Sequence, residues 1–594
     1  MTQELYNSGP YQTSEEDYEL GSFTIQPTEG VYEPIEARIR GALTYPSDPL
    51  VSKAPLVILA HGRHSANIEN FRGLMYLAHH LSSHGYICAS IDLNDLVGPQ
   101  GTKISQKPPI VTGGAIFHRA KTILRTIVEL KSHPIVGTRA NFKNVGLIGH
   151  SRGAEAVARA GAMSEESGNI FNIKAVFSIA PVDFSGVHLG LPFFLLYGDL
   201  DADVSDGQSF RVWDRAKSNK YGFYVSGAIH NYFSSNWDNE WDSEISRTIS
   251  RTSHELIAKA YTLSFFESYL KHNTKTLALL TKGKLLGELS NLEVSRLYSS
   301  IDRYEIDTFN GLFDPSVNSL GLSCSMSGAG TMSELDMERT KVNASGLRSE
   351  LAVYYDYHKY LKDPRYEQYY NYINIELSRI SKNFVSIFKY FIDASQDSIA
   401  APLLGIIKQS YSNFENNPSG WLFFENQLRI NVFTGLADSI QYVEANSGAL
   451  HSLNHVGKGL RIDWSANDAV YRTNIGGIDF SNYKWLSLRV GQLYDTNKDS
   501  LFNPANTDQS FTIAIIDSSQ TKSAIYSSQI DSDVSYPKSD QSHFKSALQT
   551  MLVPTSSFLE QCPELNLSSI EQLCLVFNRV ASGSLVIDDI ALIK

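Results

Sequence analysis

The chain has 594 residues, which at roughly 150 residues per domain allows about two to four domains and excludes a single small module. Hydrophobic residues make up 42% and charged residues 19%, a composition typical of folded rather than disordered chains. The net charge of −12 repels nucleic-acid phosphates and anionic lipids, so we expect neither as a partner. The four cysteines are widely spaced with no Cys-x-x-Cys pair, which argues against a disulfide framework or a thiolate zinc site.

The start of the chain, MTQELYNSGPYQTSEEDYEL, is acidic and polar, without the basic start and apolar stretch of a secretory signal. No run of about 20 apolar residues occurs further on, so we expect a soluble protein with no membrane span. The chain as given therefore predicts a cytoplasmic location. A secreted protein is the alternative if the precursor has been trimmed.

Residues 18–273 alternate short apolar runs with longer helical ones, the pattern of an α/β domain with a mostly parallel, doubly wound sheet. Two alternating runs, SFTIQ and EARIRGALTY, predict antiparallel edge strands at its start. Six apolar runs predict buried strands that end at Ala60, Leu93, Gly149, Ala180, Gly198 and Ala228. An apolar stripe predicts a helix packed on this sheet, carried by Ile116, Phe117, Ala120, Ile123, Leu124, Ile127 and Val128.

The remaining chain divides into two sections of different character. In residues 274–423, apolar positions such as Leu351, Leu361 and Phe388 recur at helical spacing, which predicts a mainly helical linker or cap. Within it, residues 311–330 are rich in Ser, Gly and Leu and predict a loop or short strands. Residues 424–594 carry period-two runs that predict an all-β sandwich. The stretches GKGLRIDW and SLVIDDIALIK resemble strands of jelly-roll modules of carbohydrate-binding domains, so a carbohydrate or protein ligand is one expectation for this section.

The most specific motif is Gly149-His150-Ser151-Arg152-Gly153, which follows the apolar strand VGLIG and precedes the helical run AEAVARAGAM. A nucleophile elbow requires this tight strand-to-helix turn, because small flanking residues tolerate a strained serine and let the helix approach the sheet. Ser151 would then stand at a helix N-terminus, which favours developing negative charge. The alternative interpretation is an ordinary turn containing glycine.

A serine hydroxyl needs a base to take its proton, and a base needs a carboxylate to orient it. His230 follows the last predicted buried strand and is the candidate base. The preceding strand runs into Asp199-Leu200-Asp201-Ala202-Asp203, and we favour Asp201 over Asp199 because its reach past the strand lets it turn back toward His230. This spacing also resembles a calcium loop, as does Asp495-Thr496-Asn497-Lys498-Asp499. Both lack the glycine and the final acid of an EF-hand, so we expect a solvated turn at Asp495, Asn497 and Asp499, with a structural cation as the alternative.

The chain order Ser, Asp, His is that of the α/β-hydrolase superfamily. Residues from about 30 to 270 resemble its dienelactone hydrolase, platelet-activating-factor acetylhydrolase and cutinase-like polyester hydrolase branches. The resemblance implies that LVILAHGRH contains the oxyanion loop, with the backbone amides of Arg63 and Arg152 facing the carbonyl oxygen. It supports Asp201 through the arrangement Gly-x-x-Asp-x-x-Val. It also implies that His61 and His64 shape the loop and do not accept protons.

These patterns together predict a serine esterase that cleaves small-molecule or polymeric carboxylic esters through an acyl-enzyme, with no cofactor and no metal. The same three side chains could instead serve an acyltransferase or a thioesterase. A peptidase and an inactive binding protein are further alternatives. Tyr232, Phe233 and Trp237 follow His230 and could line a substrate pocket, or could simply pack in the core.

Overall fold

The computed structural model describes residues 5–25, 35–96, 112–204, 207–238, 247–281, 285, 287–310, 314–337, 453–494, 503–530, 533–537 and 545–594. Across these ranges no helix combines the length and the apolar character needed to cross a bilayer. The same ranges contain no group of three or more His, Cys, Asp or Glu side chains arranged to hold a metal ion. The predicted turn at Asp495, Asn497 and Asp499 lies outside the described residues.

The first part of the chain forms one mixed sheet of nine strands in the order β1-β2-β4-β3-β5-β6-β7-β8-β9. Strands β3 to β8 pair in parallel, whereas β1 and β2 at one edge and β9 at the other are antiparallel to their neighbours. The structure therefore confirms the mostly parallel sheet and the antiparallel strands at its start. The strands are β1 (Thr13–Ile25), β2 (Ile35–Pro46), β3 (Ala54–Ala60), β4 (Ile87–Ile91), β5 (Ala140–His150), β6 (Ile173–Ile179), β7 (Phe193–Gly198), β8 (Lys220–Val225) and β9 (Val294–Ser299).

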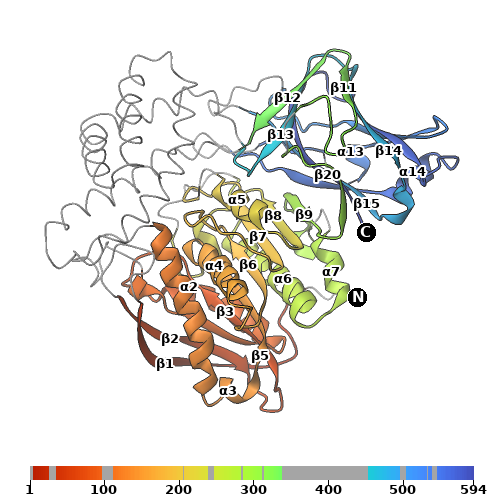
Figure 1. The fold of residues 1–594 in the computed structure, drawn as a ribbon. Helices are drawn as coiled ribbons and strands as arrows, with labels where there is room; N and C mark the ends of the chain where they lie inside the picture. Colours follow the sequence, from red (N-terminus) through yellow and green to blue (C-terminus); the bar gives the residue numbers. More distant parts are fainter. Residues whose placement is uncertain are drawn as a thin grey trace, which may run out of the picture.

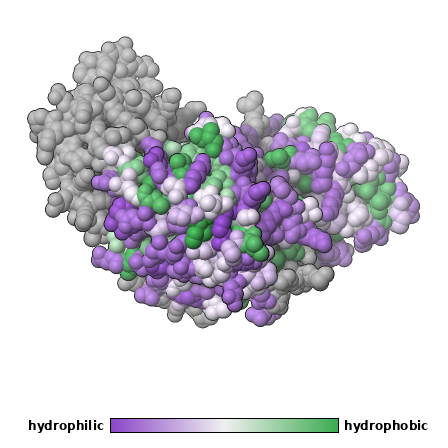
Figure 2. Space-filling view, turned by 90° about the horizontal axis from the view of Figure 1, so that it is seen from below, coloured by the Kyte–Doolittle hydropathy of each residue, from purple (hydrophilic) through white to green (hydrophobic). Residues whose placement is uncertain are grey.

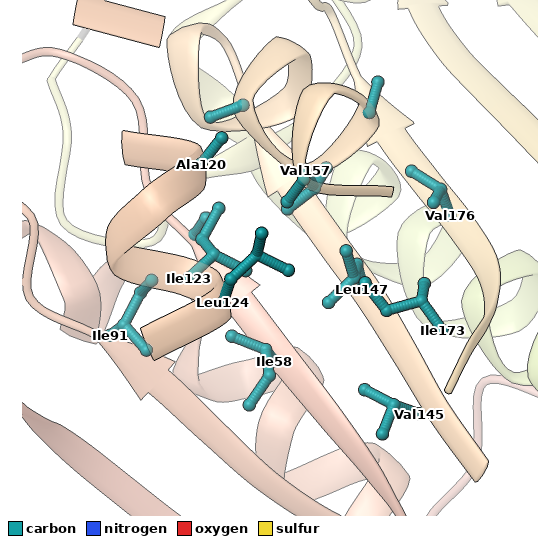
Figure 3. Packing of buried hydrophobic residues seen from close by; sticks show 14 of the residues in the cluster. Ile58, Ile91, Ala120, Ile123, Leu124, Val145, Leu147, Val157, Ile173 and Val176 are labelled. Atoms are coloured by element: carbon teal, nitrogen blue, oxygen red, sulfur yellow. The ribbon is translucent and has the colours of Figure 1, made fainter. Parts of the chain in front are cut away.

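Helices cover both faces of this sheet (Figure 1). Because side chains alternate along a strand, Leu56 and Ile58 of β3 join one buried cluster and Val57 and Leu59 join another. Helices α2, α4 and α5 pack in the first cluster, and Figure 3 shows Ala120, Ile123 and Leu124 of α2 facing the strands. Helices α1 and α6 pack in the second cluster. The helices are α1 (Met75–Ser83), α2 (Thr112–Glu129), α3 (Val136–Arg139), α4 (Arg152–Glu166), α5 (Gln208–Arg215), α6 (Arg251–Leu270) and α7 (Thr274–Leu280).

The first sheet continues past residue 273, where we expected this part of the chain to end. Helix α7 packs on α6, and β9 pairs along the whole of β8. Strand β9 is only six residues long, and of its buried residues Arg296, Leu297 and Ser299 only Leu297 is apolar. This explains why its sequence gave no strong strand signal.

The last part of the chain forms two antiparallel sheets, here called the C-terminal sheets. Their facing side chains share one buried cluster that includes Ile462, Leu488 and Ile513 from the predicted period-two runs. One sheet contains β12 (Gly330–Asp336), β13 (Lys458–Trp464), β20 (Gly583–Ile593), β15 (Trp485–Gln492) and β18 (Gln549–Pro554), with β10 (Arg303–Asp307) paired to β20. The other contains β11 (Cys324–Ser327), β14 (Ala469–Ile478), β19 (Ile570–Phe577), β16 (Thr512–Asp517) and β17 (Lys522–Tyr526). Two short helices, α13 (Ser527–Ile530) and α14 (Thr555–Gln561), complete this part.

The predicted helical section, residues 274–423, differs from the structure between residues 294 and 336, where strands lie. Strands β10, β11 and β12 lie there and pair with strands from the end of the chain. Of these, β11 falls within residues 311–330, for which a loop or short strands were predicted. Their pattern is weak because each is short and largely exposed, so its partner strands decide its conformation. The helical spacing at Leu351, Leu361 and Phe388 lies outside the described residues.

The C-terminal sheets lie beside the β8–β9 edge of the first sheet (Figure 1). Strand β18 contacts β9, where Arg296 donates to the Thr550 carbonyl over 2.8 Å. On the face shown in Figure 2, polar side chains predominate and apolar ones form small separate groups.

Candidate active site

Ser151 lies in the tight turn between β5 and α4. Its backbone has φ 58° and ψ −126°, a conformation that residues other than glycine rarely adopt. The Ser151 amide donates to the Ile179 carbonyl of β6 over 2.9 Å, which ties the turn to the sheet. This strained strand-to-helix turn is the local geometry that a nucleophile elbow requires.

The glycines around Ser151 have no room for a side chain. A Cβ atom on Gly149 would lie 2.3 Å from the Gly153 carbonyl oxygen, and one on Gly153 would lie 2.2 Å from that of Ala60. A Cβ atom on Gly62 would lie 2.6 Å from the Ser151 Cβ. The glycines therefore let α4 pack directly on the strand backbones and let the loop after β3 lie against the serine.

His230 follows β8, directly before a 3₁₀ turn at Asn231–Phe233. Its Nδ1 lies 2.7 Å from the Asp201 Oδ2, and both side chains are almost fully buried. The other oxygen of Asp201 accepts from the Val204 amide over 2.7 Å. Burial would raise the pKa of Asp201, but His230 and the hydrogen bonds outweigh it and lower the pKa below its usual range. An ionised carboxylate here holds the proton of the neutral imidazole on Nδ1 and leaves Nε2 as the basic nitrogen.

The other two aspartates of this loop have different partners. Asp199 accepts from the Gly227 amide over 2.7 Å and from Arg247 over 2.6 Å. Asp203 is half exposed, and its Oδ2 lies 3.3 Å from Nε2 of His230, on the opposite side of the ring from Asp201. Of the three aspartates, Asp201 is therefore the one whose carboxylate meets Nδ1.

A cluster of aromatic rings links His230 to the elbow. The His150 ring, next to Ser151 in the chain, lies 4.7 Å from the His230 ring and 4.9 Å from Trp237, between ring centres. The Trp237 indole also lies against Gly62, since a Cβ there would be 2.7 Å from Trp237 Cη2. Burial, followed by the charge of His230, lowers the pKa of His150 well below its usual range, so this ring is neutral.

The three aromatic residues predicted for a substrate pocket differ in position. Trp237 belongs to the ring cluster just described. Phe233 is fully buried, with its ring 4.8 Å from that of His254 in α6. Tyr232 lies 5.5 Å from the same histidine and under the guanidinium of Arg251. These contacts favour core packing for Phe233 and Tyr232, whereas Trp237 lies against Gly62, which also adjoins the serine.

The predicted oxyanion loop is held by its own buried side chains. His61 donates from Nδ1 to the Gly62 carbonyl over 2.7 Å and accepts at Nε2 from the Leu93 amide over 2.8 Å. Burial lowers its pKa, so it is a neutral ring with both nitrogens occupied. Arg63 directly follows Gly62 in the chain, and Arg152 begins α4, whose first amides have no partner within the helix.

Three residues near the site were not predicted from the sequence. His150 lies inside the Gly-x-Ser-x-Gly motif, but the motif itself assigns no role to its side chain. Arg119 is fully buried and donates to the His61 carbonyl over 2.9 Å. Its position within the apolar stripe of α2 is a sequence feature that could have indicated a buried charge. Lys545 donates to the Asp201 carbonyl over 2.9 Å. No local pattern could have found it, since it lies 344 residues further along the chain.

Comparison with known proteins adds one similarity. A model of the Chlorophyllase family matches residues 18–192, which include Ser151 and the loop after β3 but neither Asp201 nor His230. The search of curated proteins found no match. The matched region is less than a third of the chain. Over residues 18–192 the chain is thus similar to a family of ester hydrolases of the α/β-hydrolase type.

Proposed function

We propose that the protein is a serine hydrolase that cleaves carboxylic esters through an acyl-enzyme, with Ser151 as nucleophile, His230 as general base and Asp201 as the carboxylate that orients it. The observation that carries the proposal is the buried 2.7 Å contact between His230 Nδ1 and Asp201, beside a serine in a strained strand-to-helix turn. The similarity of residues 18–192 to Chlorophyllase supports ester hydrolysis in general. The resemblance to dienelactone hydrolases, acetylhydrolases and cutinase-like enzymes points the same way.

In this mechanism the Ser151 hydroxyl attacks the ester carbonyl while Nε2 of His230 takes its proton. Asp201 keeps the imidazole in the required tautomer and stabilises the imidazolium that forms. The backbone amides of Arg63 and Arg152 donate to the oxyanion, and each such donor typically contributes about 3 kcal/mol to the stability of the transition state. His230 then returns the proton to the leaving alcohol. In the second half of the reaction His230 takes a proton from water, the water attacks the acyl-enzyme, and His230 returns the proton to Ser151 as the acid leaves.

The first sheet with its helices forms the catalytic unit in this proposal. We assign the C-terminal sheets to a jelly-roll-like sandwich, and a carbohydrate or protein ligand at that sandwich remains part of the proposal. The shared core between the two sheets supports a sandwich, because two sheets that pack face to face bury their alternate side chains against each other.

A fluorophosphonate probe tests the enzyme class. We expect wild-type protein to be labelled at Ser151 and to hydrolyse p-nitrophenyl esters, and Ser151→Ala to lose both properties while keeping its thermal unfolding midpoint. Peptide mapping identifies the labelled residue. Ser185→Ala is a matched control, because Ser185 lies in a loop beside Glu155 and outside the elbow. Labelling that persists in Ser151→Ala would overturn the proposal.

Adding an alcohol or amine acceptor separates hydrolysis from acyl transfer. We expect the free acid to remain the main product when the acceptor is present at millimolar concentration. If the acyl group went mainly to the acceptor, the enzyme would be an acyltransferase that uses the same three side chains.

A further inference from the structure

A buried lysine from the C-terminal sheets reaches the loop that carries Asp201. Lys545 precedes β18 in the chain, and its side chain is almost fully buried. Its Nζ donates to the carbonyls of Asp201 (2.9 Å) and Gly198 (3.2 Å) and to the hydroxyl of Tyr197 (3.1 Å). An ammonium group has three donors, and these three acceptors all belong to β7 or to the loop that follows it.

The same contacts brace the far end of this loop. The Tyr197 hydroxyl, which accepts from Lys545, donates in turn to the Val204 carbonyl. The Val204 amide donates to Asp201 over 2.7 Å. Residues 198–204 are therefore held at their start, middle and end by a network that includes Lys545. A backbone loop held at three points keeps its carboxylate in one position relative to His230.

The C-terminal sheets, which adjoin the segment that carries Lys545, are firmly attached to the part of the protein that contains the first sheet. Asp214 of α5 accepts from Arg489 of β15 over 2.7 Å and meets His455 Nδ1 at 2.9 Å. Arg489 also donates to Asp588 of β20 over 2.8 Å. Charged groups that are buried and paired across an interface are costly to separate, because each would be left without a partner. The C-terminal sheets thus present Lys545 from a fixed position.

We propose that Lys545 is a positioning residue for the esterase reaction and that the C-terminal sheets complete the active site by holding the loop of Asp201. This inference rests on the proposed function. Three acceptors compensate the cost of burying an ammonium group, so the contact persists in the folded protein. Its positive charge is also one of the influences that hold the pKa of Asp201 low against burial.

The test compares Lys545→Met with Lys522→Met in the full chain. Methionine keeps most of the aliphatic stem and removes the ammonium, while Lys522 is exposed on β17 of the same sheets. We expect Lys545→Met to lower kcat for a p-nitrophenyl ester about 10- to 100-fold, the cost of a small misplacement of a catalytic group, with KM within about twofold. The rate of fluorophosphonate labelling should fall by the same factor. Lys522→Met should match wild type in all three measurements.

A double-mutant cycle shows whether Lys545 acts through Asp201. In an Asp201→Asn background, Lys545→Met should cause less than about a threefold further loss, because the group it positions has already been removed. A full additional loss of 10-fold or more would overturn the proposal in favour of general destabilisation. Equal kcat in Lys545→Met and Lys522→Met would overturn it too, while leaving the Ser151 mechanism intact.

A second variant keeps the test decisive if Lys545→Met does not fold. Tyr197→Phe removes only the hydroxyl that bridges Lys545 and Val204, and the buried ring remains. We expect a smaller loss of kcat in the same direction, with KM unchanged. If Tyr197→Phe kept wild-type activity, the hydrogen bonds from Lys545 through Tyr197 to Val204 would not position Asp201, and the proposal would be overturned. A wild-type protein without esterase activity or Ser151 labelling would instead overturn the proposed function itself.

Discussion

At the scale of single residues, the site depends on which atom of His230 each aspartate meets. Asp201 contacts Nδ1 from a fully buried position, whereas Asp203 is half exposed and lies 3.3 Å from Nε2. In the proposed mechanism His230 takes the Ser151 proton on Nε2, so a carboxylate at Nδ1 and a carboxylate at Nε2 have different effects. Asp201 favours the tautomer with the proton on Nδ1, whereas Asp203 accepts a hydrogen bond from Nε2 only when that nitrogen is protonated.

This difference predicts unequal effects of two matched substitutions. We expect Asp201→Asn to lower kcat about 10³- to 10⁴-fold, as loss of the orienting carboxylate does in serine proteases. Asp203→Asn should change kcat by less than about tenfold, because an exposed charge pair contributes little. Steady-state kinetics with a p-nitrophenyl ester measures both. Equal and small losses would mean that another carboxylate orients His230.

At the scale of secondary-structure elements, the elbow depends on how closely α4 approaches β3. A Cβ atom on Gly153 would lie 2.2 Å from the carbonyl oxygen of Ala60 and 2.5 Å from that of His61, and these backbone atoms cannot yield as a flexible side chain can. The Ser151 turn and the loop after β3 meet at this junction. The position of α4 therefore determines where the Ser151 side chain lies and where the first backbone amides of the helix point.

Gly153→Ala tests this close approach. The added methyl group should force α4 away from β3, lower the free energy of unfolding by about 1–3 kcal/mol and reduce labelling of Ser151 by the fluorophosphonate. Gly161→Ala is the matched control in the same helix, because the three atoms nearest to its Cβ would belong to the flexible side chains of Leu189, Val176 and Leu191 and not to the backbone. We expect that variant to keep wild-type labelling and a free energy of unfolding within about 1 kcal/mol. Urea unfolding and labelling rates measure both outcomes, and equal behaviour of the two variants would contradict the argument.

At the scale of the whole molecule, a buried charge network joins the C-terminal sheets to the first sheet. Burial would raise the pKa of Asp214, but the charges of His455, Arg489 and Lys220 outweigh it and hold this pKa far below its usual value. A carboxyl whose pKa is lower in the folded than in the unfolded state adds stability above its unfolded pKa. That contribution is lost as the pH falls through the range between the two values.

The network therefore predicts a pH-dependent effect of Asp214→Asn. At pH 6 to 7 we expect the variant to be less stable than wild type by about 3 kcal/mol, because the buried cations Arg489 and Lys220 lose the compensating charge of Asp214. Below pH of about 3.9, wild type should lose this advantage by up to about 1.4 kcal/mol per pH unit, so the gap narrows. Urea unfolding at a series of pH values measures the gap. A gap that stays constant down to pH 3 would contradict the assigned role of Asp214.

The sequence by itself determined the local features, because each is encoded by neighbouring residues. Continuous apolar runs predicted strands β3 to β8, and the glycines around Ser151 predicted its tight turn. Order along the chain, reach past a strand and the resemblance to a known family favoured Asp201 and His230, whose side chains the structure places 2.7 Å apart. These signals suffice where a segment's own side chains decide its conformation.

Only the tertiary structure decided the features that depend on distant partners. Strands β9 to β12 form because neighbouring strands pair with them, not because of strong patterns of their own. Asp203 meets His230 through the path of a loop, and Lys545 meets the Asp201 loop across 344 residues. No local pattern records such contacts. The first contact arises from the way two loops of one sheet meet, and the second arises when the C-terminal sheets pack against the first sheet.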